Sequence, residues 1–287
     1  MNISSDEKIG FIGLGNMGNG IYKNLVKANY NIVAFDKIKK KIPKTQSLSY
    51  NSLDYIFDNC KIIIFCISTN DEIFKIIKKQ YVKNNTLILD LTTSLPKKSK
   101  MIAEYLKDYK SHYIDCAMSG GATGAMNGTL SLMIGGNKNI FMKIKPILSS
   151  FADNLFYLGG VGSGQLVKLL HNSVCHGIFL MNCEVLKTGE SYGISAKNII
   201  DVFNKSNARS FISEKRFPDH ILNKKFNGKS TISNLKKDLN MANKLFKYLY
   251  NNNSYTSLTS KKLNQIDSKF NEDDFTTIYK NWKKIFN

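Results

Sequence analysis

The chain has 287 residues, with 41 Lys and Arg against 22 Asp and Glu, and a formal net charge of +19. A hydrophobic fraction of 43% with 11% aromatic residues excludes an intrinsically disordered chain, and the length is enough for one or two domains with buried cores. Only Arg209 and Arg216 are arginines, whereas proteins that read phosphates and base edges favour arginine. The charge is also even, with 21 basic and 12 acidic residues in 1–160 and 20 and 10 in 161–287. We therefore expect no nucleic-acid partner.

Short apolar runs alternate with amphipathic stretches in the first half of the chain. Strands are predicted at 8–13, 31–36, 61–68, 86–92, 112–119, 130–136 and 154–160. Helices are predicted at 16–28, 96–106 and 138–150. Continuous apolar strands separated by helices indicate a parallel sheet that is covered on both faces.

The second half shows no strong strand signal. Residues 165–191 predict one long helix, with an apolar stripe formed by Leu166, Leu169, Leu170, Val174, Ile178, Met181 and Val185. The predicted fold is α/β: a Rossmann-type doubly wound domain of residues 1–160, joined by the long helix to an all-α domain of residues 161–287.

A glycine-rich turn follows the first predicted strand and opens the first predicted helix. Gly13-Leu14-Gly15-Asn16-Met17-Gly18 is a G-x-G-x-x-G motif in the context that binds dinucleotides. Asp36 ends the second predicted strand, where a carboxylate accepts hydrogen bonds from ribose hydroxyls and repels a 2′-phosphate. The motif predicts NAD as the cofactor, with NADP as an alternative because Lys37 and the lysines after it could neutralise a phosphate.

The five cysteines and the N-terminus bear on the cellular compartment. The cysteines are odd in number and form no C-x-x-C pair, which fits a reducing compartment. The first residues do not read as a signal peptide, and no apolar run is long enough to cross a membrane. We expect a cytoplasmic protein without a membrane partner and without a metal site.

Three further stretches carry candidate chemistry. Ser119, Gly120 and Gly121 can present backbone N–H groups to an anion, although a flexible loop is an equal alternative. Lys168 and Asn172 lie four residues apart and share one helical face, where partial burial of the lysine would lower its pKa. A solvated charge is the ordinary alternative for this lysine, as it is for Lys237 at the start of a later helix.

Taken together, five segments resemble the β-hydroxyacid dehydrogenase family, which includes 3-hydroxyisobutyrate dehydrogenase and tartronate semialdehyde reductase. The segments are GFIGLGNMG (10–18), DLTTSLP (90–96), DCAMSGGATGAMNGTLSLMIGG (115–136), GGVGSGQLVKLLHN (159–172) and KDLNMA (237–242). They follow the order and spacing of the family's motifs from about residue 8 to residue 242.

The resemblance implies a role for each matching position. Lys168 would be the general acid/base, and Asn172 would hold the substrate. Ser119, Gly120 and Gly121 would bind the substrate carboxylate. Thr93 would lie between cofactor and substrate, and Lys237, Ile67 and Ser68 would contact the cofactor. The implied activity is the NAD(P)-dependent interconversion of a short β-hydroxy acid and its semialdehyde by a homodimer or homotetramer.

Departures from the family pattern concern the pocket, and rival functions stay open. Ser68 stands where the family has proline, and Cys116, Ala117 and Met118 replace its usual Ala-Pro-Val. One rival is a non-catalytic dehydrogenase-like module that binds nucleic acid or protein. Another is a reductase of a different carbonyl or imine substrate, in which the catalytic lysine would be replaced. A 6-phosphogluconate dehydrogenase would need a larger helical domain.

Overall fold

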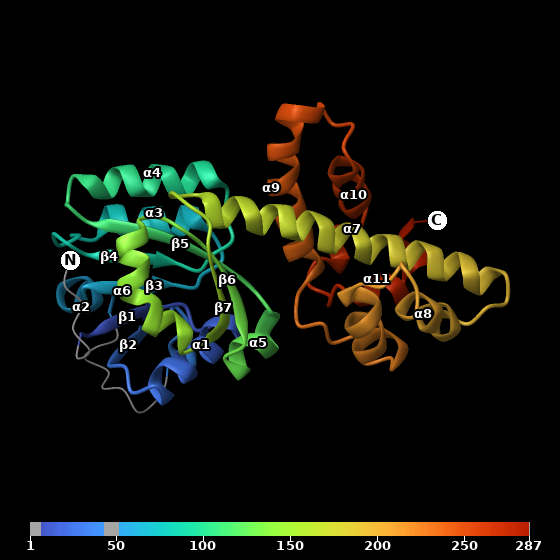
Figure 1. Ribbon diagram of the computed structural model, residues 1–287, viewed down its shortest axis with the longest axis horizontal. Helices are drawn as coiled ribbons and strands as arrows, with labels where there is room; N and C mark the ends of the chain where they lie inside the picture. The colour runs from blue at the N-terminus through green and yellow to red at the C-terminus, as the bar shows by residue number, and fades with distance from the viewer. Residues whose placement is uncertain (1–6, 43–51, 287) are drawn as a thin grey trace. The chain divides into compact units, whose positions relative to one another are not determined.

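The computed structural model describes residues 7–42 and 52–286 (Figure 1). The chain divides into two compact units, residues 1–168 and residues 169–287. This division falls inside one long helix, eight residues beyond the boundary expected at residue 160, because the first turn of that helix is hydrogen-bonded to the sheet of the first unit.

The first unit contains a seven-stranded sheet with the strand order β2-β1-β3-β4-β5-β6-β7. The strands are β1 Ile9–Ile12, β2 Ile32–Phe35, β3 Ile62–Phe65, β4 Leu87–Asp90, β5 His112–Ser119, β6 Leu130–Gly135 and β7 Ala152–Tyr157. All neighbouring pairs are parallel except β5 and β6. All seven predicted strands are present, and the exception is explained by the connection of ten residues between β5 and β6, which is too short for a parallel crossover.

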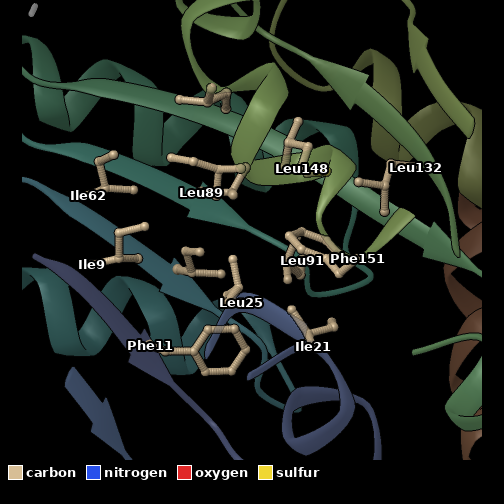
Figure 2. Packing of buried hydrophobic residues seen from close by; sticks show 14 of the residues in the cluster. Ile9, Phe11, Ile21, Leu25, Ile62, Leu89, Leu91, Leu132, Leu148 and Phe151 are labelled. Atoms are coloured by element: carbon tan, nitrogen blue, oxygen red, sulfur yellow. The ribbon is translucent and has the colours of Figure 1, made fainter. Parts of the chain in front are cut away.

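Helices cover both faces of the sheet, and the alternation of side chains along each strand divides the core into two clusters. On one face, Ile9 and Phe11 of β1 pack with helices α1 (Asn16–Lys27) and α6 (Lys138–Ser149), as Figure 2 shows. On the other face, Ile12 of β1 belongs to a cluster with α2 (Leu53–Asn59), α3 (Asn70–Lys79) and α4 (Pro96–Lys107). The sheet is therefore doubly wound, as predicted.

Two helices of the first unit, α2 and α3, were not predicted from the sequence. Each begins at a hydrogen-bonding N-cap, Ser52 for α2 and Thr69 for α3. A third short helix, α5 (Gly121–Asn127), lies within the glycine-rich stretch after β5. A 3-10 turn at Lys39–Lys41 completes the described part of this unit.

The second unit is built from helices. It contains most of α7 (Ser163–Ser191), followed by α8 (Ala196–Asn204), a π-helical segment (Ile212–Leu222), α9 (Ile232–Tyr250), α10 (Tyr255–Asn264), a 3-10 turn (Ser268–Phe270), α11 (Thr277–Lys280) and α12 (Trp282–Phe286). No helix in residues 7–42 and 52–286 is both long enough and apolar enough to cross a membrane.

The apolar stripe predicted along α7 is only partly buried: Leu169 is 0% exposed and Ile178 packs against the core of the second unit. Val174 and Met181 are 63% and 59% exposed, whereas Phe179, Cys183 and Leu186 are buried in the core of the second unit. Apolar residues occur on more than one side of this helix, so periodicity alone could not tell which side packs against the other helices.

Candidate active site

The predicted dinucleotide loop lies between the end of β1 and the start of α1, at the point where the order of parallel strands reverses and ligands usually bind. Gly13 has a φ of 104°, and a Cβ there would lie 2.3 Å from the carbonyl oxygen of Cys66. A Cβ at Gly18 would lie 1.9 Å from the carbonyl oxygen of Gly13, so this glycine allows α1 to approach the strand. At Gly15 a Cβ would meet no protein atom within 4 Å, and α1 begins at Asn16 with its N–H groups at this loop.

Asp36 follows β2 directly and is tied to the glycine loop. One carboxylate oxygen accepts a hydrogen bond from the backbone N–H of Leu14 at 2.7 Å, and the other accepts from the N–H of Ile38 at 2.8 Å. The side chain is buried. A carboxylate oxygen has more than one lone pair, so these bonds leave it able to accept from a ribose hydroxyl as well.

The loops after β3 and β4 lie side by side at the same edge of the sheet. The N–H of Ile67 donates to the hydroxyl of Thr92 at 3.4 Å. Thr93 is partly buried in the loop between β4 and α4, and Ser68 is exposed after β3. The residues expected to face the cofactor from these loops therefore share one edge with the glycine loop.

The first turn of α7 is fixed to this edge by two buried side chains. Asp115 of β5 accepts hydrogen bonds from the N–H of Gly162 at 2.6 Å and from the N–H of Gln165 at 3.0 Å. Burial raises the pKa of Asp115, while these backbone hydrogen bonds oppose the rise. The side chain of Gln165 bonds to the backbone on both sides of Thr93. Lys168 lies three residues later on the same helix and is 9% exposed.

A buried polar network supports the β4 loop from inside the unit. Asp90 accepts hydrogen bonds from the hydroxyl of Tyr113, from the amide of Asn70 and from the N–H of Thr92. The amide oxygen of Asn70 accepts from the hydroxyl of Ser94 at 3.0 Å. Burial raises the pKa of Asp90 to about 6, and the hydrogen bonds that it accepts limit the rise.

The candidate carboxylate site lies at the end of β5. Ser119 is the last residue of the strand, Gly120 has a φ of 124°, and Gly121 opens α5 with a φ of 61°. Only glycine adopts such angles readily, and a side chain at Gly121 would meet no protein atom within 4 Å. Both glycines are exposed, and Gly121 is the first residue of α5, where a backbone N–H has no acceptor within the helix, so an anion could approach this turn.

The second unit brings two of the family-like segments together. Asn172 of α7 is 4% exposed, and its amide nitrogen donates to a carboxylate oxygen of Asp238 at 2.7 Å. The amide oxygen of Asn172 lies 3.0 Å from Nδ1 of His171. Lys237 precedes Asp238 on α9, with its Nζ 3.9 Å from the second Asp238 oxygen. The orientation of the Asn172 amide is thus set by its neighbours.

Several residues of this arrangement were missed by sequence reasoning. Gln165, Asp115, Asp90 and Asp238 lie inside the motifs, yet none was assigned a role. Asp115 and Asp90 had a usable signal, since each is an acidic residue at the end of, or within, a continuous apolar strand. Gln165 had none, because glutamine is an ordinary residue of a helix and its partners lie more than 70 positions earlier.

The first unit has the features that an NAD(P) cofactor requires. The glycine loop leads into helix α1 at the point where the strand order reverses, and the carboxylate of Asp36 lies at the end of β2. The space beside Gly15, where a side chain would project, contains no protein atom within 4 Å. Backbone N–H groups at the start of a helix favour a pyrophosphate. The residues present therefore fit a dinucleotide.

Comparisons with known proteins agree with this geometry. Residues 8–159 match the family described as the NAD binding domain of 6-phosphogluconate dehydrogenase. Residues 162–282 match the family described as the NAD-binding region of NADP-dependent 3-hydroxyisobutyrate dehydrogenase. Together the two matches cover both compact units.

Individual relatives extend the comparison. A probable mitochondrial 3-hydroxyisobutyrate dehydrogenase of Dictyostelium discoideum is 31% identical over 75% of this chain and 69% of its own length. A 2-(hydroxymethyl)glutarate dehydrogenase of Eubacterium barkeri is 28% identical over 82% of this chain and 81% of its own.

Solved structures share the fold. A 3-hydroxyisobutyrate dehydrogenase of Mycobacterium tuberculosis with L-serine superposes with a TM-score of 0.86 at 20% identity, covering 96% of this chain and 99% of its own. An imine reductase of a Pseudomonas species has a TM-score of 0.64 at 15% identity, with the same coverage. The two matching family regions and the dehydrogenase relatives show that this chain belongs to the β-hydroxyacid dehydrogenase family of NAD(P)-dependent oxidoreductases.

Proposed function

We propose that this enzyme interconverts a short β-hydroxy acid and its semialdehyde, with Lys168 as general acid/base and NAD as the preferred cofactor. The observation that carries the proposal is a buried lysine, Lys168, three residues after Gln165, whose side chain is hydrogen-bonded to the backbone on both sides of Thr93. Lysine at this position is also what separates the proposal from the imine-reductase alternative.

The proton chemistry follows from the residues of the chain. In oxidation, the neutral amine of Lys168 accepts the proton of the substrate hydroxyl. In reduction, its ammonium group donates a proton to the carbonyl oxygen of the semialdehyde. Bound NAD(P) supplies the hydride acceptor in one direction and the hydride donor in the other.

Substrate orientation is assigned to two sets of residues. The backbone N–H groups of Ser119, Gly120 and Gly121 bind the substrate carboxylate, which sets the distance from this anchor to the reacting carbon. Asn172 contributes a hydrogen bond from an amide whose orientation Asp238 fixes. Holding the reacting carbon in this way lowers the entropic cost of the transfer.

The preference for NAD rests on charge. We assign the buried carboxylate of Asp36, at the end of β2, to the adenosine ribose, where a 2′-phosphate would bring two negative charges together. Lys237 of α9 contributes a positive charge to the cofactor, and Ile67 and Ser68 contact it from the β3 loop.

Assembly and location form a second part of the proposal. Leu170, Val174 and Met181 are exposed along α7, and covering them in a homodimer or homotetramer would remove apolar surface from water. The five free cysteines, all within the described residues, suit a reducing, cytoplasmic setting. Size-exclusion chromatography with light scattering tests the oligomeric state.

A substrate panel tests the proposed reaction. We expect the purified protein to oxidise at least one short β-hydroxy acid, and to reduce the matching semialdehyde, with higher kcat/KM for NAD(H) than for NADP(H). α-Hydroxy acids and cyclic imines serve as controls of the same size. Turnover of imines without turnover of any hydroxy acid would contradict the proposal and favour the imine-reductase alternative.

A further inference from the structure

We infer that Gln165 is a positioning residue of the proposed reaction: it joins the Thr92–Ser94 segment to the helix turn that carries Lys168. The inference rests on the roles proposed above for Lys168 and Thr93. It adds a residue whose side chain has no direct part in proton transfer but sets where two reacting elements lie relative to each other.

The side-chain amide of Gln165 uses both of its ends on one short segment. Its nitrogen donates to the carbonyl oxygen of Thr92 at 2.6 Å, and its oxygen accepts from the N–H of Ser94 at 2.8 Å. Gln165 is 0% exposed, so water cannot replace these bonds without a change of structure. Thr93 lies between the two bonded residues, and the amide therefore fixes the backbone on each side of it.

The backbone of Gln165 is fixed just as firmly to the sheet. Its N–H donates to Asp115 of β5 at 3.0 Å, and the same carboxylate accepts from Gly162 at 2.6 Å. A Cβ at Gly164 would lie 2.2 Å from the carbonyl oxygen of Met133 in β6, so this turn of α7 is packed directly on the strands. Lys168 lies about one helical turn after Gln165, so the position of its backbone is set by the same contacts with the sheet.

The Thr92–Ser94 segment keeps other supports when Gln165 is changed. The N–H of Thr92 donates to Asp90 at 2.8 Å, and the hydroxyl of Ser94 donates to Asn70 at 3.0 Å. Loss of the Gln165 bonds should therefore loosen the position of Thr93 without unfolding the sheet. A displacement of about 1 Å in a reacting group can cost on the order of 100-fold in rate.

Two substitutions of similar size separate positioning from bulk packing. Gln165→Leu removes both hydrogen bonds at every pH. Gln165→Glu removes the donor only while the glutamate is ionised, because the protonated carboxyl group has the O–H donor and the acceptor that the glutamine amide supplies. In the ionised form, a carboxylate oxygen would face the carbonyl oxygen of Thr92.

The experiment compares kcat and KM of both variants with the wild type between pH 5.5 and 9. We expect Gln165→Leu to lower kcat about 10- to 100-fold at all pH values with a smaller change in KM. Burial at this fully buried position raises the pKa of the introduced glutamate, so the ratio of Gln165→Glu to wild-type kcat should rise at least about 10-fold as the pH falls and the glutamate becomes protonated. The carboxyl groups around this position, Asp115 and Asp90, and Lys168 itself are present in all three proteins, and the uncharged Gln165→Leu variant shows whether their own titration changes the ratio to wild type.

Hydrogen exchange of the cofactor-free protein gives a second readout that needs no turnover. Peptides covering residues 91–95 should exchange faster in Gln165→Leu, while peptides from β4 and β5 should be unchanged. Wild-type kcat in both variants would overturn the inference, and so would faster exchange throughout the sheet, because the residue would then be structural. Failure of the proposed function is distinct: it would appear as a wild-type protein without hydroxy-acid turnover.

Discussion

Replacing Asp90 by Asn tests whether the fold resists ionisation of the carboxyl group at the end of β4. Asp90 is 0% exposed, and burial raises its pKa from 3.8 to about 6 although Tyr113, Asn70 and Thr92 donate hydrogen bonds to it. Asparagine has nearly the same shape as the neutral acid and carries no charge. The variant therefore removes the ionisation and keeps most of the packing.

The size and sign of the effect follow from the two pKa values. Each pKa unit corresponds to about 1.36 kcal/mol, so a rise from 3.8 to about 6 corresponds to about 3 kcal/mol. Well below pH 3.8 the carboxyl group is neutral in the folded and unfolded states and causes no penalty. Between about pH 4 and 6 the folded state holds a proton that the unfolded chain has lost, so the free energy of unfolding falls as the pH rises. Above pH 6 the full penalty is present.

Hydrogen exchange of β4 peptides measures this penalty where it arises. Wild type and Asp90→Asn are compared at each pH from 4 to 7, so that the intrinsic pH dependence of exchange cancels. We expect the free energy of opening of the wild type to fall by about 2 kcal/mol relative to the variant over this range, because part of the penalty is already present at pH 4. Glu104→Gln, at an exposed position on α4, is the control and should run parallel to the wild type. Parallel curves for Asp90→Asn as well would refute the reasoning.

Three other substitutions have defined outcomes. Asp36→Asn removes a charge near the ribose position and should shift the NAD-to-NADP ratio of kcat/KM toward NADP by at least about 10-fold; steady-state kinetics with both cofactors would show an unchanged ratio if Asp36 has no such role. In Gly15→Ala the added Cβ meets no protein atom within 4 Å, so the midpoint of urea denaturation should stay at the wild-type value. The Kd for NADH, from fluorescence titration, should rise at least about 10-fold, because the methyl group lies where the backbone approaches the pyrophosphate. Gly164→Ala places a Cβ 2.2 Å from a carbonyl oxygen and should lower the free energy of unfolding by about 1–3 kcal/mol; a wild-type denaturation midpoint would contradict the packing described.

The sheet was predictable because most of its strands are continuous apolar runs in the sequence. Runs such as Ile62–Phe65 are buried on both faces and contain no polar residue, a pattern that a covered parallel strand requires. The antiparallel direction of β6 was not predicted, since apolar runs carry no information about direction. The apolar stripe predicted on α7 is only partly buried, because apolar residues surround much of that helix and the neighbouring helices decide which of them pack.

The candidate site was predictable where its residues form local motifs. The motif from Gly13 to Gly18 is six consecutive residues at the start of α1. The positive φ of Gly13 and the close approach of Gly18 to the carbonyl oxygen of Gly13 explain why these two positions need glycine. The support of the site was not predictable, because it consists of contacts between distant positions. Gln165 bonds to residues more than 70 positions earlier, and Asp238 bonds to Asn172 across 66 positions. A single sequence contains no signal for such pairs.

Lys168 is the residue on which the proposed chemistry depends most directly. Its replacement by Ala removes the proposed proton acceptor and leaves the glycine loop and Asp36 unchanged. Lys145→Ala, at an exposed position on α6, is the matched control.

The decisive measurement is the pre-steady-state rate of NADH formation by Lys168→Ala, with the best hydroxy acid from the panel and saturating NAD. A general base contributes about 100- to 10,000-fold, so we expect the rate to fall by at least about 100-fold while the Kd for NADH stays within about 3-fold of the wild type. Lys145→Ala should match the wild type in both quantities. A wild-type rate of NADH formation in Lys168→Ala would contradict the central claim.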